Sequence, residues 1–261
     1  RVRPPGSLSE CEFLSRCLRC GQCMRVCPTN VIQPAVLEAG WEAIWTPVLN
    51  FRVGTSGCQH TCIACGHVCP TAAIRPLTRD ERTGQNRFKE QGPLRIGNAF
   101  VDRGRCLPWA MNRPCIVCQE NCPVSPKAIF TRVVFNPVQL ERSLTVASAD
   151  KKELVIDDAA LPPGRYASGD SSCRVNDQSP KQIVRQTEQI ISISVAHTFD
   201  PTPQLGDDVQ LLIRLQQPFV TPERCIGCGI CEHECPVSGQ RAIRVTAENE
   251  SREAQHGFLL S

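Results

Sequence analysis

The apolar residues of this 261-residue chain occur in short groups that alternate with polar or Pro/Gly-rich segments. A capping box formed by Ser9 and Glu12 predicts a short helix from about residue 9 to residue 17. Residues 31–50 carry apolar side chains at helical spacing, which predicts a broken amphipathic helix. The apolar face of that helix would consist of Val36, Leu37, Trp41, Ile44 and Trp45.

In the second half of the chain the apolar residues recur at every second position instead of at helical spacing. Residues 144–148 and 191–195 alternate apolar with small or polar residues, as half-buried strands do. Residues 154–156 and 209–215 are short apolar runs that also suit strands. We therefore predict a β-rich insertion over 138–216 without a catalytic constellation. It would serve either to dock a partner or as a family-specific decoration.

Cysteine changes this picture, because the chain contains eighteen of them. Sixteen fall into four runs that each end in Cys-x2-Cys-x3-Cys-Pro, and a disulfide framework has no need of such a repeat. Zinc sites also use Cys-x2-Cys pairs but do not require the remaining cysteines and the proline, so iron–sulfur ligation is preferred. The four runs are Cys17, Cys20, Cys23 and Cys27; Cys58, Cys62, Cys65 and Cys69; Cys106, Cys115, Cys118 and Cys122; and Cys225, Cys228, Cys231 and Cys235.

The first and fourth runs have the Cys-x2-Cys-x2-Cys-x3-Cys-Pro spacing of bacterial [4Fe–4S] ferredoxins. In two-cluster ferredoxins the first three cysteines hold one cluster and the fourth ligates the other cluster. The second run opens with Cys-x3-Cys-x2-Cys, which radical S-adenosylmethionine enzymes share, but Cys69 supplies a ferredoxin-type fourth ligand. The third run is the least regular, with eight residues between Cys106 and Cys115. We predict four [4Fe–4S] clusters with all sixteen cysteines as iron ligands, and no catalytic residue.

The charge balance does not indicate a nucleic-acid partner. The formal net charge is +3, and four oxidised clusters of about −2 each would bring the loaded protein to roughly −5. No Rossmann or P-loop glycine pattern is present in the sequence, so no nucleotide is expected. We expect arginines near the runs to offset the negative charge of the clusters, namely Arg16, Arg19, Arg25, Arg103, Arg105 and Arg224.

The chain repeats itself around the cysteines. Matching lead-in strands precede the third and fourth runs at 98–106 and 217–225, whereas the charged, Gly-rich segment 75–97 predicts a surface connection. One such unit cannot bury its own apolar face, so the units must pair. The expected class is α+β, with two bacterial-ferredoxin-like modules of two clusters each. A Cys-Pro…Ile unit follows the last cysteine of each run, at 27–32, 69–74, 122–129 and 235–243.

These segments make the chain resemble the MauM/NapG ferredoxin-type family of exported, four-cluster electron-transfer proteins. The resemblance lies in residues 3–23, 101–124 and 225–245. It implies a ferredoxin fold, an electron-transfer role and a position on the exocytoplasmic (periplasmic) side of the membrane, peripheral or anchored by an upstream segment. The chain departs from the family in the spacing of its second run and in the length of the insertion.

Two pairings of the repeats are open, sequential (one with two, three with four) and nested (one with four, two with three). We favour the nested pairing, because runs one and four are the most regular and related four-cluster subunits nest this way. The domains would then be 1–137 with three repeats, 138–216 as the insertion, and 217–261 as the fourth repeat paired with the first. The nested ligand sets are Cys17, Cys20, Cys23 and Cys235; Cys225, Cys228, Cys231 and Cys27; Cys106, Cys115, Cys118 and Cys69; and Cys58, Cys62, Cys65 and Cys122.

We interpret the chain as an electron-transfer subunit, not an enzyme, of a membrane-associated, hetero-oligomeric redox complex. Its partners would be a quinone- or cytochrome-linked membrane module and an oxidoreductase. A freely diffusing exported polyferredoxin and a cluster-based enzyme are the alternatives. The chain begins at Arg1, so a processed form and a piece of a longer protein are both open. Cys11 and Cys173 lie outside the runs and are expected to be free thiols or, in an oxidising compartment, a disulfide.

Overall fold

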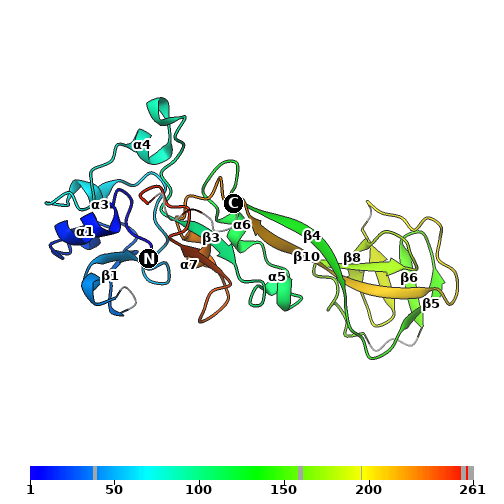
Figure 1. The fold of residues 1–261 in the computed structure, drawn as a ribbon. Coiled ribbons are helices and arrows are strands. Elements are labelled where there is room, and N and C mark those ends of the chain that lie inside the picture. Colours follow the sequence, from blue (N-terminus) through cyan, green and yellow to red (C-terminus); the bar gives the residue numbers. More distant parts are fainter. Residues whose placement is uncertain (38–39, 158–160, 195, 254–256, 258–261) are drawn as a thin grey trace. The chain divides into compact units, whose positions relative to one another are not determined.

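The computed structural model describes residues 1–37, 40–157, 161–194, 196–253 and 257, which form two compact units (Figure 1). The second unit contains the range 138–216 but begins at Arg132, ends at Gln217 and also takes in Leu107–Cys115. The first unit comprises Arg1–Cys106, Ile116–Thr131 and Pro218–Ser261.

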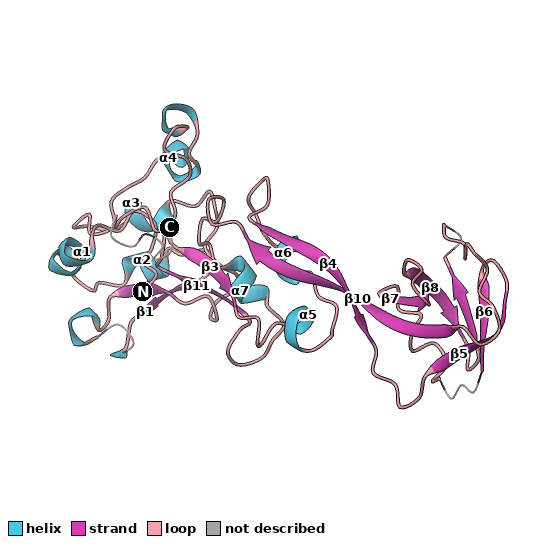
Figure 2. Cartoon of the chain, turned by 45° about the vertical axis from the view of Figure 1, so that its right-hand side comes forward, coloured by secondary structure: helices cyan, strands magenta, loops and turns pink. Residues whose placement is uncertain are grey.

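The first unit contains short helices and short antiparallel strand pairs joined by loops (Figure 2). This mixture agrees with the predicted α+β class. In the part of the chain that the structure describes, no helix is long and apolar enough to span a bilayer. The helices are α1 (Glu10–Arg16), α2 (Gln22–Arg25), α3 (Ala64–His67), α4 (Arg79–Thr83), α6 (Val117–Glu120) and α7 (Ile230–Glu234), with 3₁₀ helices η2 (Trp41–Ala43) and η3 (Asn86–Phe88). The strands are β1 (Ile32–Pro34), β2 (Pro47–Leu49), β3 (Asn98–Val101) and β11 (Ile243–Thr246).

The helix predicted at residues 9–17 is confirmed as α1, which buries Phe13 completely. The amphipathic helix predicted over 31–50 is wrong. That segment forms an antiparallel pair in which Ile32 of β1 lies opposite Leu49 of β2. Proline explains the difference, because Pro34 and Pro47 lack the N–H that a helix interior requires.

The apolar residues of 31–50 do not pack as the helical pattern suggested. Trp41 is 81 % exposed and Trp45 is 66 % exposed, and Val36 and Leu37 are exposed as well. None of these four side chains is therefore part of the buried core of this unit.

The second unit is an antiparallel sheet that closes on itself. Strand β10 pairs with β5 at one edge and with β7 at the other, which completes the ring β10-β5-β6-β9-β8-β7. Alternate residues point inward to a core that includes Leu154, Ile183 and Ile191. The unit also contains α5 (Leu107–Ala110). Its strands are β5 (Leu144–Ala149), β6 (Glu153–Asp157), β7 (Ser171–Val175), β8 (Lys181–Gln186), β9 (Ile190–Ile193) and β10 (Asp208–Val220), and β4 (Ile129–Pro137) pairs with β10.

The two cysteines outside the runs are free thiols. Cys173 is completely buried in the core of the second unit, and burial raises its pKa to about 12. Cys11 is exposed on α1 of the first unit.

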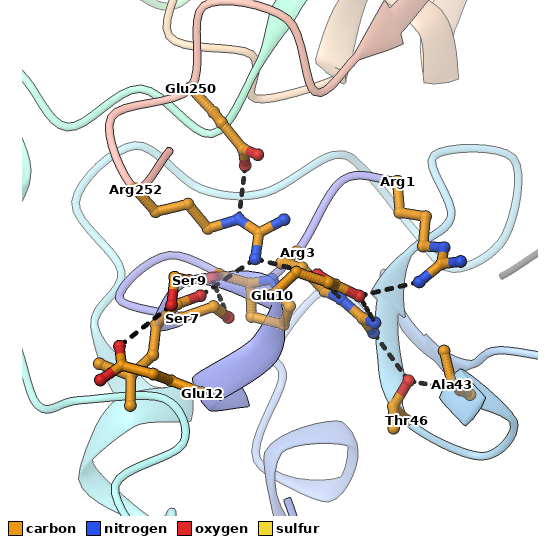
Figure 3. Close-up of polar contacts among 12 residues, drawn as sticks. Arg1, Arg3, Ser7, Ser9, Glu10, Glu12, Ala43, Thr46, Glu250 and Arg252 are labelled. Carbon is orange, nitrogen blue, oxygen red and sulfur yellow. Dashed lines mark hydrogen bonds and ion pairs between the residues drawn. The ribbon is translucent and has the colours of Figure 1, made fainter. Parts of the chain in front are cut away.

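A carboxylate on α1 ties both ends of the first unit together (Figure 3). Glu10 Oε1 accepts hydrogen bonds from Arg1 Nη1 at 2.9 Å and from Arg3 Nη2 at 2.5 Å. Glu10 Oε2 accepts one from Arg252 Nη1 at 3.1 Å. Arg3 is fully buried and also donates to Thr46 Oγ1 at 2.8 Å, so one carboxylate links the N-terminal segment, the β1–β2 loop and the C-terminal segment.

The environment of Glu10 holds its carboxyl in the ionised form. Burial alone would raise the pKa, but the hydrogen bonds and charges of Arg3 and Arg252 outweigh it and lower the pKa from 4.5 to about 2. Because the folded pKa lies below the unfolded one, this stabilisation is present above about pH 4.5 and is lost as the pH falls through about 2.

We expect Glu10→Gln to lower the free energy of unfolding by about 2 kcal/mol at neutral pH, since it leaves the buried guanidinium of Arg3 without its carboxylate. The difference from the unmodified protein should stay constant down to about pH 4.5 and narrow below it. Thermal unfolding followed by circular dichroism measures both. Glu12→Gln is the matched control, because among the described hydrogen bonds this carboxylate accepts only that of Ser9 Oγ. An equal loss in both variants would contradict the account.

Candidate iron–sulfur sites

All four runs fold locally in the same way. The third cysteine of each run is the second residue of a short helix. In the first and fourth runs, Gly21 and Gly229 precede that helix with φ of 72° and 74°, a left-handed conformation that favours glycine. The helical cysteines are Cys23 in α2, Cys65 in α3, Cys118 in α6 and Cys231 in α7.

Site one is a hollow lined by three cysteines of the first run and the last cysteine of the second, together with Phe13 and Ile74. Ile74 N–H donates to Cys69 Sγ at 3.5 Å. Burial, followed by the charges of the other three cysteines, raises the pKa of Cys23 to about 12. The four cysteines of site one are Cys17, Cys20, Cys23 and Cys69.

Site two is a second hollow, lined by three cysteines of the second run and the last cysteine of the first, with Val31 and Ile32. Burial raises the pKa of Cys58 and, together with neighbouring cysteines, raises that of Cys65 to about 12. The four cysteines of site two are Cys27, Cys58, Cys62 and Cys65.

Site four is lined by three cysteines of the fourth run and the last cysteine of the third, with Ile226 and Val245. Ala99 N–H donates to Cys225 Sγ at 3.4 Å. Burial, followed by the nearby cysteines, raises the pKa of Cys228 to about 12. The four cysteines of site four are Cys122, Cys225, Cys228 and Cys231.

The three hollows fit a [4Fe–4S] cluster in the chemistry of their donors. Each offers four thiols and an otherwise largely apolar lining, and in sites one and four a backbone N–H points at one of the sulfur atoms. Binding to iron deprotonates a coordinating thiol outright, so the raised pKa values of the free thiols do not prevent ligation. Among the described residues, no group of three or more His, Cys, Asp or Glu side chains surrounds a single-ion position.

The nested pairing favoured from the sequence differs from what the structure shows. Cys27 lies with the second run, Cys69 with the first and Cys122 with the fourth, which is the sequential alternative. The path of the chain explains this result. The β1–β2 pair leads directly from run one to run two, and β4 leaves run three beside β10, which returns to run four.

The remaining set comprises the first three cysteines of the third run and the last of the fourth. The charge of Cys118 contributes to the raised pKa of Cys231, which indicates that the two side chains lie near each other. Cys106 and Cys235 are buried, but Cys115 belongs to the second compact unit. The assembly of these four cysteines into site three therefore stays a prediction, and so does ligation by all sixteen.

Sites two and four are lined by different pairs of runs, and a backbone hydrogen bond joins them. Cys58 N–H donates to Cys228 O at 2.7 Å. His233 Nδ1 lies 3.1 Å from Phe51 O, which adds a second contact between the second and fourth runs' segments. At Gly57 an added Cβ would meet Cys228 O, so only glycine fits at this junction.

Exposure distinguishes site one from the other hollows. Cys20 is exposed and Cys17 is partly exposed. In site two Cys58 and Cys65 are buried, and in site four all three cysteines of the fourth run are buried. Of the three hollows, site one lies nearest to solvent.

The arginines expected to offset cluster charge are not buried, and Arg16, Arg19 and Arg25 are exposed. Arg82 was not expected from the sequence to lie at a site. It is completely buried and donates from Nη2 to Cys58 Sγ at 3.8 Å. It lies on α4, inside the segment predicted as a surface connection. The sequence does contain one sign of a helix in this segment, the capping residue Thr78. In the structure its hydroxyl accepts a hydrogen bond from the backbone N–H three residues later and caps α4.

Comparisons with known proteins also indicate 4Fe-4S binding. A family profile described as a 4Fe-4S binding domain matches residues 13–33 and 218–238, which contain the first and fourth runs. The chain is 34% identical over 131 residues to the ferredoxin-type protein NapG of Escherichia coli (strain K12), a match covering 49% of this chain and 51% of NapG.

Methylamine utilization ferredoxin-type proteins named MauM match as well. The Methylobacillus flagellatus protein is 34% identical over 149 residues, covering 55% of this chain and 54% of MauM. The Paracoccus denitrificans protein is 29% identical over 172 residues, covering 61% and 69%. The chain spans about half the length of the NapG and MauM relatives with the highest identity. The resemblance predicted from the sequence is confirmed: the chain contains two segments that match a 4Fe-4S binding domain and is similar to the ferredoxin-type proteins NapG and MauM.

Proposed function

We propose that the chain is a non-catalytic electron-transfer subunit that holds four [4Fe–4S] clusters in a row. The hydrogen bond between Cys58 N and Cys228 O carries this proposal. It joins two residues that belong to different modules and to neighbouring four-cysteine sets. The order along the row is site one, site two, site four and site three.

When bound, each [4Fe–4S] cluster accepts and releases one electron. The protein surrounds sites two and four with apolar side chains and excludes water from most of their cysteines. The N–H groups of Ile74 and Ala99 point at ligand sulfur atoms, and such hydrogen bonds favour the reduced, more negative state. The exposed Cys20 makes site one the place where a partner can approach most closely.

The partners that this arrangement supports are two redox proteins, one at each end of the row. We propose a hetero-oligomeric complex on the exocytoplasmic side of the membrane. There the chain would connect a quinone- or cytochrome-linked membrane module to an oxidoreductase. The similarity to NapG and MauM supports this proposal. A freely diffusing ferredoxin is the alternative, and copurification of other subunits after mild solubilisation would separate the two.

Iron and sulfide analysis of anaerobically purified protein tests the cluster number. The proposal predicts about sixteen iron and sixteen sulfide per chain, with four one-electron signals in a redox titration followed by EPR. About eight iron per chain would contradict it. Signals that appear only when a substrate is added would favour the enzyme alternative.

A further inference from the structure

Arg82 occupies an unusual position for a charged side chain. None of it is exposed to solvent. Nη1 donates to Leu94 O at 2.7 Å and Nη2 donates to Cys58 Sγ at 3.8 Å, while Nε has no hydrogen-bond partner among the described residues. The guanidinium therefore lies between the backbone of one segment and a cysteine of site two.

A buried guanidinium requires a negative partner, because an isolated ion costs several kcal/mol to remove from water. In the described part of the chain no carboxylate forms an ion pair with Arg82. The group that can carry a negative charge beside it is the sulfur of Cys58. A cluster held by four thiolates carries about −2 in the oxidised state, which would balance this cation.

The segment around Arg82 holds the side chain in place. Arg82 N–H donates to Thr78 O at 3.0 Å, and Arg82 O accepts from Leu94 N at 3.3 Å. Gly84 ends α4 at φ 67°, and an added Cβ there would meet the backbone of Gly92. The loop packs closely enough to fix the direction in which the guanidinium points.

We propose that Arg82 is the built-in counter-ion of the cluster at site two and makes that cluster easier to reduce than its four cysteines alone would make it. This inference rests on the proposed function, because it requires a cluster on Cys27, Cys58, Cys62 and Cys65. Reduction adds one negative charge beside a cation that water does not screen, so the reduced state gains more than the oxidised state. Site four has a weaker counterpart in Arg95, which is only partly buried and influences Cys225.

The consequence is local to site two. The Arg82 cation would raise the reduction potential of the cluster held there, and its removal would lower that potential. Arg82 acts through the cluster's surroundings and is a positioning residue, because it donates to a ligand sulfur and does not bind iron itself.

EPR-monitored redox titration of Arg82→Met tests the proposal, since methionine keeps an apolar stem and removes the charge. We expect one signal to shift to lower potential by at least a tenfold change in its reduction equilibrium, about 59 mV, with the other three unchanged. Cys62→Ser identifies that signal as site two, because it alters only the cluster it ligates. Arg82→Lys should restore most of the potential, and the matched control Arg95→Gln should leave the site-two signal in place.

Each outcome has a distinct meaning. If none of the cluster signals of the unmodified protein changes in Cys62→Ser, the cluster assignment is refuted, and the proposed function with it. If Arg82→Met keeps its full iron content and its site-two potential does not shift, the counter-ion role is overturned while the proposed function stands. If Arg82→Met loses that cluster, Arg82→Lys decides: retention at nearly the original potential supports the proposal, and a loss as severe as with methionine shows a merely structural role.

Discussion

Replacing Cys69 with alanine will disrupt the same cluster as replacing Cys20, although the two residues belong to different runs. Both line site one, where they would ligate different irons of one cluster. Each single variant is expected to lose one EPR signal and up to about four iron per chain, and the double variant should lose no more. Cys11→Ala is the control, because this exposed thiol lies outside the runs.

The double variant separates the two pairings directly. In the nested arrangement, Cys69 would ligate with Cys106, Cys115 and Cys118, while Cys20 would remain with the first cluster. The effects would then add, and the double variant would lose two signals and up to about eight iron. Additive losses would therefore contradict the sequential arrangement.

Replacing Gly57 with alanine will weaken the junction between the two modules while leaving every cysteine in place. The added Cβ would meet Cys228 O and lie 2.5 Å from Ile230 N, and neither backbone atom can move without displacing the fourth run. Overpacking of this kind costs about 1–3 kcal/mol. The magnetic interaction between reduced clusters at sites two and four should weaken, because it falls steeply with distance.

Pulsed EPR of the reduced protein measures that interaction, and chemical denaturation measures the loss of stability. Gly104→Ala is the matched control, since the nearest atom to its added Cβ is Asp102 Oδ1 at 3.5 Å. An unchanged interaction in Gly57→Ala with full cluster content would show that the Cys58–Cys228 contact does not set the spacing of the two sites.

The cysteine spacing identified the three cysteines of one run that line each of the hollows, because the geometry of a tight ligand loop depends on neighbours two or three residues apart. It could not predict the pairing, which depends on where the intervening chain leads. Runs one and four look most alike in sequence, but the β1–β2 pair and the β4–β10 pair bring neighbouring runs together instead. The regular spacing shared by runs one and four therefore did not indicate that these two runs pair with each other.

Local patterns also failed where one residue type overrode them. Residues 31–50 have helical spacing of apolar side chains, yet Pro34 and Pro47 favour the strand pair. Arg82 lies in a charged, Gly-rich segment whose composition predicts exposure, and only the fold reveals that this side chain is buried against Cys58. A buried cation of this kind is not visible from composition.

Diffraction at the iron absorption edge, from crystals of anaerobically purified protein, tests the central claim most directly. The anomalous map shows the clusters themselves and the cysteines around each. The account predicts four clusters in a row, with Cys69 on the cluster of Cys17, Cys20 and Cys23, and Cys27 on that of Cys58, Cys62 and Cys65. A cluster shared by Cys17 and Cys235, or fewer than four clusters, would contradict it.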